Sequence, residues 1–477
     1  MTMQRLGARR SWAFAGALML AGCATVGPDY HAPPPPAGIA EKPTAFAEGN
    51  SPAFAAEPLP DRWWRLYAIP QLDALVEEAI RANTDLRIAA ANLERAQAIV
   101  QEIRASAHVQ TSVNGGASAG ETSNLGLGSP AGTHATFDAG VGISYELDVV
   151  GRIRRTIEAA DADAQAQAAA YDLARTTVVA GVVGAYSDAC AAGARLVVAR
   201  RSMELQRQSL ALTDRGVRAG LYTPLDAMRS RALLAQLEAA LPPLEADRKA
   251  ALYSLAVLLG RAPEDYPPGL ASCQIIPTID QPLPIGDGMA LIRRRPDIRQ
   301  AERQLAAATA RMGVATAELY PSVSFGASLG TTSRGVGNLF DSSAFRFSLG
   351  PLISWTFPNR GVARARIAEA DAASRGALAA FDGSVLSALR EVETALSTYA
   401  RNLDQNAKLK IARDENRKAS ALLARMTRGG LGTGLELLDA ERSLAQAEAA
   451  LAMSNAAIGN DRIRLFLALG GGWEADE

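Results

Sequence analysis

The chain has 477 residues, of which 48% are hydrophobic and only 5% aromatic, so small aliphatic side chains supply most of its apolar surface. This composition is typical of long packed helices. With 49 basic and 50 acidic side chains, no broad cationic surface is available for a phosphate backbone, which argues against nucleic acid as a partner. Three cysteines and three histidines, without a CxxC, HxxxH or HExxH motif, are too few for a zinc or iron site. We therefore expect no metal and no cofactor.

Residues 1–22 have the features of a secretory signal peptide, with arginines before a short apolar run. The run is too short to span a bilayer, and it ends at small residues before Cys23. This ending resembles a bacterial lipobox, in which Cys23 is acylated and becomes the first mature residue. The alternative is a chance cysteine in an ordinary signal peptide. Because Ala24 rather than Asp follows, the resemblance points to the outer membrane.

Residues 23–62 are rich in proline and alanine and predict an extended lipidated tether without helix or sheet. Order is expected to begin at Trp63. From there the sequence is duplicated: residues 83–87 match 295–299 at an offset of 212, and residues 144–147 and 220–226 match 354–357 and 430–436 at an offset of 210. The offset predicts a first repeat at 63–272, a linker at 273–294, a second repeat at 295–470 and a tail at 471–477.

Each repeat contains a proline-free helical segment of 67 residues, 152–218 and 362–428. Such a helix would be about 100 Å long if unbroken, which disfavours an ordinary globular bundle with helices of roughly 8–20 residues. Shorter helices are expected at 85–107, 225–260, 296–318 and 435–469. Pro242 and Pro243 should kink the second of these.

Four segments alternate apolar and small polar residues with period two: 109–118, 137–148, 323–329 and 345–357. This pattern is typical of transmembrane β-strands, although on its own it fits a soluble half-buried hairpin equally well. The outer-membrane signal favours membrane strands. Glycine-, serine- and threonine-rich loops are expected at 119–136 and 330–344. Because four strands cannot close a barrel, membrane strands would require the chain to oligomerise.

Four motifs, together with the lipobox, carry a resemblance to a known family: WWRLY at 63–67, YELDVVGR at 145–152, RRPDIR at 294–299 and LYP at 319–321. With the duplicated plan of helices and strands, the chain resembles the outer membrane factors of tripartite efflux and secretion systems, the TolC-like family. The motifs place it nearest the OprM and NodT lipoprotein branch. The resemblance covers the chain from about residue 60 onward.

The resemblance implies a mainly α fold with a small membrane β-barrel. Duplicated long-helix hairpins would form a trimeric α-barrel, and four transmembrane β-strands per protomer would form one twelve-stranded barrel. The implied function is a passive, lipid-anchored duct in the outer membrane, carrying drugs and other small toxic molecules outward. The implied partners are two further copies of the chain, a periplasmic adaptor, an inner-membrane RND-type transporter and outer-membrane lipid.

Two other functions remain open, a periplasmic adaptor or scaffold lipoprotein and a type I protein-secretion channel. An adaptor would carry one helical hairpin beside a lipoyl-like half motif, whereas two duplicated hairpins are present here. We do not expect an enzyme, because no acid, base or nucleophile cluster accompanies the three histidines, His31 in the tether, His108 at a helix-to-strand junction and His134 in a loop.

The candidate functional region lies at two helical turns, 216–226 and 428–439, where glycines allow the chain to reverse. The resemblance implies adaptor contacts at the hairpin tips, namely Gly220, Leu221, Thr223, Gly430, Leu431 and Thr433. It also implies a periplasmic gate, in which Glu436 and Asp439 form acidic rings while Asp226 braces the neighbouring hairpin. Crowded carboxylates of this kind should have raised pKa values. Alternatively, these acids are simply favourable helix starters.

The chain departs from the family at the entrance latch. In the best-known member a tyrosine and an arginine hold the entrance, and the matching positions here are Thr427 and Gly432. Once Cys23 is acylated, Cys190 and Cys273 remain in an oxidising compartment. A disulfide and two buried free thiols are both compatible with the sequence, since it does not show the Cα spacing that a bridge requires.

Overall fold

The computed structural model describes residues 25–34, 46–121, 133–355, 360–429 and 431–471, and the structural statements below concern these residues. They belong to two compact units. Unit 1 is drawn from Met1–Pro34, Asn92–Ala168 and Gln300–Phe381, and unit 2 from Pro35–Ala91, Ala169–Arg299 and Asp382–Glu477. Each unit contains corresponding parts of both sequence repeats, because the two long helices pass from one unit into the other.

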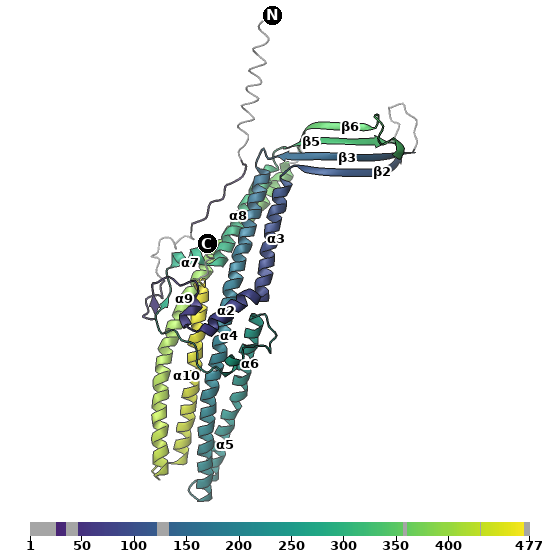
Figure 1. Ribbon diagram of the computed structural model, residues 1–477. Coiled ribbons are helices and arrows are strands. Elements are labelled where there is room, and N and C mark those ends of the chain that lie inside the picture. The colour runs from purple at the N-terminus through teal and green to yellow at the C-terminus, as the bar shows by residue number, and fades with distance from the viewer. Residues whose placement is uncertain (1–24, 35–45, 122–132, 356–359, 430, 472–477) are drawn as a thin grey trace. The chain divides into compact units, whose positions relative to one another are not determined.

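Unit 1 contains an antiparallel four-stranded sheet in the order β2-β3-β5-β6 (Figure 1). Its strands are β2 (Gln110–Glu121), β3 (Thr133–Leu147), β5 (Ser322–Ser333) and β6 (Phe345–Ser354), with the short helix η3 (Val336–Asn338) between the last two. Helices α3 (Thr84–Ser106) and α8 (Pro296–Ala317) lead into β2 and β5. The sheet is open in the single chain, with β2 and β6 at its edges.

The two faces of this sheet differ sharply in chemistry. One row of paired residues consists of Val113, Val141, Leu329 and Phe347, whose exposed fractions are 85%, 49%, 59% and 84%. The adjacent row, on the opposite face, consists of Ser112, Gly142, Ser328 and Ser348. Side chains alternate between the faces of a strand, so the predicted period-two pattern gives one apolar face and one small polar face.

The strands are longer than expected at their loop ends. Pairing of β2 with β3 continues to Glu121 and Thr133, and β5 extends to Ser333, so the expected loops at 119–136 and 330–344 were too long. His134 accordingly lies in β3 and not in a loop. Small residues look loop-like in sequence, but cross-strand hydrogen bonds satisfy their backbone groups equally well. The last strand ends at Ser354, and residues 356–357 of its predicted range 345–357 lie outside the described residues.

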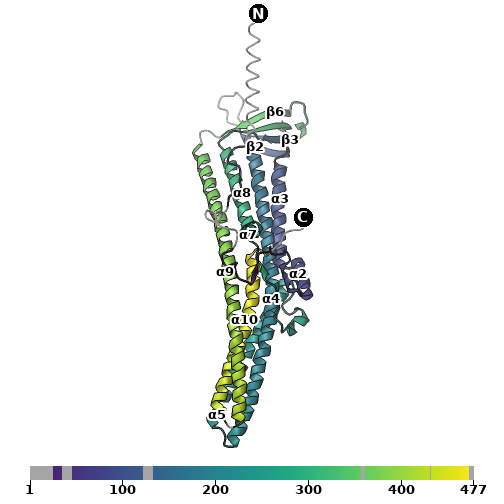
Figure 2. The same cartoon turned by 90° about the vertical axis from the view of Figure 1, so that its left-hand side faces the viewer.

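The two long helices are α4 (Arg152–Arg218) and α9 (Arg360–Arg428). In unit 2 they run beside α5 (Pro224–Ala239) and α10 (Gly434–Ala468), as Figures 1 and 2 show. Helix α6 (Leu241–Leu258) follows α5 after a break at Ala240, because Pro242 and Pro243 fit only the first turn of a helix. The predicted kink lies at Ala240, where one residue with helical backbone angles separates α5 from α6.

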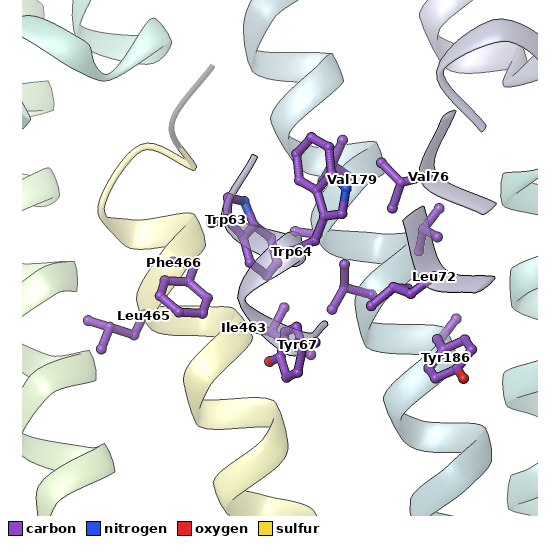
Figure 3. Close-up of a cluster of buried hydrophobic side chains, with 14 of the residues drawn as sticks. Trp63, Trp64, Tyr67, Leu72, Val76, Val179, Tyr186, Ile463, Leu465 and Phe466 are labelled. Carbon is purple, nitrogen blue, oxygen red and sulfur yellow. The ribbon is translucent and has the colours of Figure 1, made fainter. Parts of the chain in front are cut away.

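Unit 2 also contains several short elements around its core. These are β1 (Phe54–Ala55), η1 (Trp63–Tyr67), α2 (Pro70–Ala82), η2 (Pro268–Ser272), β4 (Leu283–Pro284) and α7 (Gly288–Arg294). Trp63 is 1% exposed and packs on Phe466 of α10, with ring centroids 4.8 Å apart (Figure 3). Among the described helices only α4 is apolar enough over 18 residues to cross a bilayer, and 61% of that stretch is buried in the protein. It therefore serves as core.

Order begins before Trp63, contrary to the expected tether. Phe46 and Leu59 are buried in the core of unit 2, and β1 pairs in parallel with β4. In unit 1 the buried Arg155 donates hydrogen bonds to the carbonyl oxygen of Val26 at 3.3 Å and to Asp29 at 2.6 Å. Proline-rich segments lack helical or strand periodicity, and their order here comes from contacts distant in sequence. Cys23 lies outside the described residues.

The duplicated motif at residues 83–87 and 295–299 has the same structural role in each repeat. The Asn83 side chain donates to the carbonyl of Leu258 at 2.9 Å, and the Arg295 guanidinium donates to the carbonyl of Ala468 at 2.8 Å. Leu258 and Ala468 are the last residues of α6 and α10. Each side chain thus satisfies a carbonyl that a helix end would leave unpaired.

Candidate functional site

The two helical turns of unit 2 close in the same way. The amide of Leu221 donates to the carbonyl of Gly216 at 2.8 Å, and the amide of Leu431 donates to the carbonyl of Met426 at 2.9 Å. Gly220 has a φ of +71°, a conformation that glycine adopts without strain. Gly430, the other predicted tip glycine, lies outside the described residues.

Each turn is followed by a capping box. Thr223 accepts a hydrogen bond from the amide of Asp226 at 3.3 Å, and the Asp226 carboxylate accepts from the Thr223 amide at 2.9 Å. Thr433 and Glu436 repeat this exchange at 3.2 and 2.9 Å. Each threonine therefore caps the start of a helix, and each acid accepts a hydrogen bond from the backbone amide of its threonine.

The capping hydrogen bonds also lower the pKa values of these acids in the single chain. Hydrogen bonds donated by Thr223 lower the pKa of Asp226, and those donated by Thr433 lower the pKa of the fully exposed Glu436. This direction agrees with the alternative that the acids start helices, and the raised pKa values expected where three chains bring their carboxylates together stay a prediction. Asp439 is not part of the capping box, and its exposed carboxylate forms an ion pair with Arg442 at 2.6 Å.

Exposed leucines mark both hairpin tips. Leu221 is 76% exposed and Leu431 is 79% exposed, and they occupy equivalent positions of the two repeats. Leu225 and Leu435, one turn further on, are 52% and 50% exposed. Scattered exposed leucines need no explanation, but the same pair at two equivalent turns is a candidate contact surface.

A tyrosine that the sequence analysis did not single out joins the two hairpins. The ring of Tyr222 lies against Gly216 on α4 and Gly434 on α10, where an added Cβ would approach ring carbons to 2.1 and 3.2 Å. Neither glycine could carry a side chain without displacing this ring. At the latch positions, Thr427 is 9% exposed and its Oγ1 lies 3.0 Å from where a Cβ on Gly432 would be.

Two further layers connect α4 with α10. Ser209 donates to Glu441 at 2.8 Å, and Ser202 donates to Glu448 at 3.1 Å. Including the Gly216–Gly434 layer, successive layers are one heptad apart on both helices. We call these three layers the polar seam. The signal was present in the sequence as small or polar residues at seven-residue spacing, a period that places them on one helix face.

The structure joins Cys190 and Cys273 by a disulfide, with a Cα–Cα distance of 4.7 Å. Cys190 lies on α4 and is fully buried, while Cys273 follows η2. The bridge fastens the segment between the two repeats to the long helix of the first. Among the described residues, no group of three histidine, cysteine, aspartate or glutamate side chains is arranged to hold a metal ion.

The same chain plan occurs in known proteins. The sequence matches the family described as "Outer membrane efflux protein" over residues 75–261 and 289–471, once in each half of the chain. It is 32% identical over 471 residues to the pyoverdine export outer membrane protein OpmQ of Pseudomonas putida, covering 96% of both chains. The chain belongs to the outer membrane efflux protein family. It is an outer membrane channel of an efflux pump.

Other relatives agree with this membership. Nodulation protein T of Rhizobium leguminosarum bv. trifolii is 29% identical over 440 residues, covering 91% of each chain. The solved outer-membrane channel OprN superimposes with a TM-score of 0.88 at 35% identity, covering 94% of this chain and 100% of that one. The open MtrE channel of Neisseria gonorrhoeae has a TM-score of 0.80 at 27% identity, covering 94% of this chain and 98% of that one. The two solved relatives are outer-membrane channels and not enzymes.

Proposed function

We propose that three copies of the chain form one channel, in which their sheets close a twelve-stranded barrel through the outer membrane. The observation that carries this proposal is the four-stranded sheet with one exposed apolar face, one small polar face and two free edges. In lipid, each unpaired backbone group at an edge costs several kcal/mol. Pairing β2 of one copy with β6 of the next would remove every edge. The apolar face would then contact lipid, and the polar face would line water.

The helical hairpins of unit 2 would form the periplasmic part of the duct. We assign the exposed tips, with Leu221 and Leu431 at their centres, to contacts with a periplasmic adaptor that links the channel to an inner-membrane RND-type transporter. Gly220, Thr223 and Thr433 shape these tips, and Gly430 stays a predicted tip residue. Cys23 would carry the lipid anchor, as the lipobox predicts, and one curated relative is named a probable outer membrane lipoprotein, SilC of Salmonella typhimurium.

The cargo class we propose is small molecules rather than proteins. Relatives at 29–30% identity are named for solvent, toluene and antibiotic efflux. These names favour a drug and toxin duct over the type I protein-secretion alternative. The two duplicated hairpins, each with its own capping box, disfavour the single-hairpin adaptor.

Reconstitution tests the channel directly. Light scattering of the purified protein in detergent should give the mass of a trimer, and planar bilayers should show discrete conductance steps. An adaptor or scaffold lipoprotein would not conduct. A monomer in detergent, or bilayers that stay silent at saturating protein, would refute the proposal.

The gate is tested by removing charge without removing the caps. Glutamine also serves at the third position of a capping box, so Glu436→Gln with Asp439→Asn removes two charges and keeps the helix start. We expect the cation-to-anion permeability ratio to fall by roughly half, because six carboxylates would leave the channel mouth. Asp226→Asn is the control and should change selectivity less. A double variant with parental selectivity would show that these acids only start helices.

A further inference from the structure

We propose that a cavity between the two helical hairpins of unit 2 binds organic cations with apolar bodies, and that Glu441 is their counter-ion. The cavity has a volume of about 710 Å³ and is bordered by α4, α5, α9 and α10. This volume lies within the range of about 300–1,000 Å³ that is usual for small-molecule sites. The proposal concerns a binding site within one chain and does not depend on trimer formation.

The walls of the cavity are mainly apolar. Leucines from three helices line it, together with the Tyr222 ring that joins the hairpins, namely Leu205, Leu212, Leu237, Leu437, Leu438 and Leu444. On α10 these residues continue the heptad stripe that faces α4. Glu441 occupies a position between Leu437 and Leu444 in this stripe, where a packed helix pair would ordinarily carry an apolar residue.

Glu441 is a carboxylate without a cationic partner in this apolar setting. Its carboxylate accepts a hydrogen bond from Ser209 at 2.8 Å, whereas Glu448 in the neighbouring layer accepts both from Ser202 at 3.1 Å and from Arg417 at 2.9 Å. No ion pair to Glu441 occurs among the described residues, and burial raises the pKa of its carboxyl. A desolvated carboxylate with one donor is costly, and a cation beside it would offset that cost.

A second unsatisfied polar group borders the same cavity. Thr427 of α9 is 9% exposed, and its Oγ1 has no hydrogen-bond partner within the described part of the chain. Buried hydroxyls are ordinarily paired, so this atom is a further indication of a missing ligand. Other charged groups that line the cavity are Arg215 on α4, Asp226 on α5, Arg417 and Arg428 on α9, and Glu448 on α10. Of these, the Asp226 carboxylate accepts a hydrogen bond from the amide of Thr223, and Arg417 forms an ion pair with Glu448.

The probe for this site is tetraphenylphosphonium, a permanent cation enclosed by four phenyl rings. Titration calorimetry of the purified full chain in a neutral detergent should show saturable binding of one cation per chain. Tetraphenylborate has the same shape and the opposite charge, and it should not bind saturably. Equal binding of the two ions would overturn the proposal, since apolar partitioning would then explain both.

Variants separate charge from shape. Glu441→Gln keeps the size of the side chain and should weaken binding of the cation by roughly tenfold or more, because the counter-ion is lost. Ala445→Phe should abolish binding by filling the cavity. Glu415→Gln removes an exposed carboxylate of α9 outside the cavity and is the matched control with parental affinity. Parental affinity in Glu441→Gln, or no saturable binding by the parent chain, would overturn the site.

A pH series supplies an independent readout. Protonation of Glu441 removes its charge, and its raised pKa places that loss above the ordinary carboxyl value of 4.5. As the pH is lowered from 8 to 4.5, affinity for the cation should therefore fall in the parent, with the fall beginning above the ordinary carboxyl value, and stay level in Glu441→Gln. Equal pH profiles would assign the titration to another group and overturn the role of Glu441. A silent bilayer recording with intact cation binding would instead refute the channel proposal alone.

Discussion

Leu329→Lys should prevent the sheet from inserting into a membrane, whereas Ser328→Lys should leave insertion intact. The two residues are neighbours near the middle of β5, but Leu329 lies on the apolar face and Ser328 on the polar face. A lysine at the lipid-facing midplane of a barrel costs about 2–4 kcal/mol, and a trimer would incur this cost three times. A lysine on the water-lined face remains solvated. The experiment measures the fraction of each variant that resists extraction from outer membranes and runs as a folded trimer.

The outcome that contradicts this assignment is equally specific. If both variants insert equally well, the two faces have the same environment and the sheet is not a membrane wall. If only Ser328→Lys fails, the polar face contacts lipid and the assignment of faces is inverted. The first result would also remove the main support for the twelve-stranded barrel.

Removing the disulfide should destabilise unit 2 by about 2–4 kcal/mol, the range usual for a bridge that closes a long loop. The bridge joins residues separated by 83 positions, so its loss frees a large part of the first repeat in the unfolded chain. Cys273→Ser is preferable to a change at Cys190, which is fully buried. The measurement is the denaturant midpoint of the helical signal, with and without a reducing agent.

The control for this prediction is internal. A reducing agent should lower the midpoint of the parent and have no further effect on Cys273→Ser. Peptide mapping under non-reducing conditions should recover the two cysteines as one linked pair. Recovery of both as free thiols would contradict the bridge and restore the alternative of two buried thiols.

The two long helices and the helices that flank them were predicted well because their signal is local, whereas α2 and α7 were not predicted. Helix α4 has the predicted bounds, and α9 begins two residues earlier than expected, since the absence of proline and the spacing of small apolar residues persist over the whole span. The alternation of the sheet was also local and was predicted correctly. Strand ends were less accurate, because glycine and serine have the same appearance in a loop and in a strand whose partner lies far along the chain.

Contacts between distant segments were not predictable from periodicity. The docking of residues 25–34 and 46–62 depends on partners such as Arg155 and β4, which lie more than 100 residues away. The sequence identified the turn acids but not their hydrogen bonds with Thr223 and Thr433, because these depend on how each turn folds. Whether the acids also form a gate stays a prediction. Tyr222 and Glu441 were missed because their contacts depend on how the two hairpins pack together.

The three layers of the polar seam could pair equally well in a second register, which the Tyr222 ring excludes at the turn and the 3.0 Å hydrogen bond from Asn460 to Asp188 excludes further along the same two helices. Sliding α10 by one heptad, about 10 Å, would place Ser209 opposite Glu448 and Gly216 opposite Glu441, and both pairings again match a small residue with a carboxylate. A displacement of less than one heptad would place leucines opposite the carboxylates. The two helices can therefore pair only in registers that differ by a whole heptad. The Tyr222 ring lies between Gly216 and Gly434, and it fits there only in the observed register. The Tyr222 ring and the Asn460–Asp188 hydrogen bond thereby select one register in an interface whose other layers repeat.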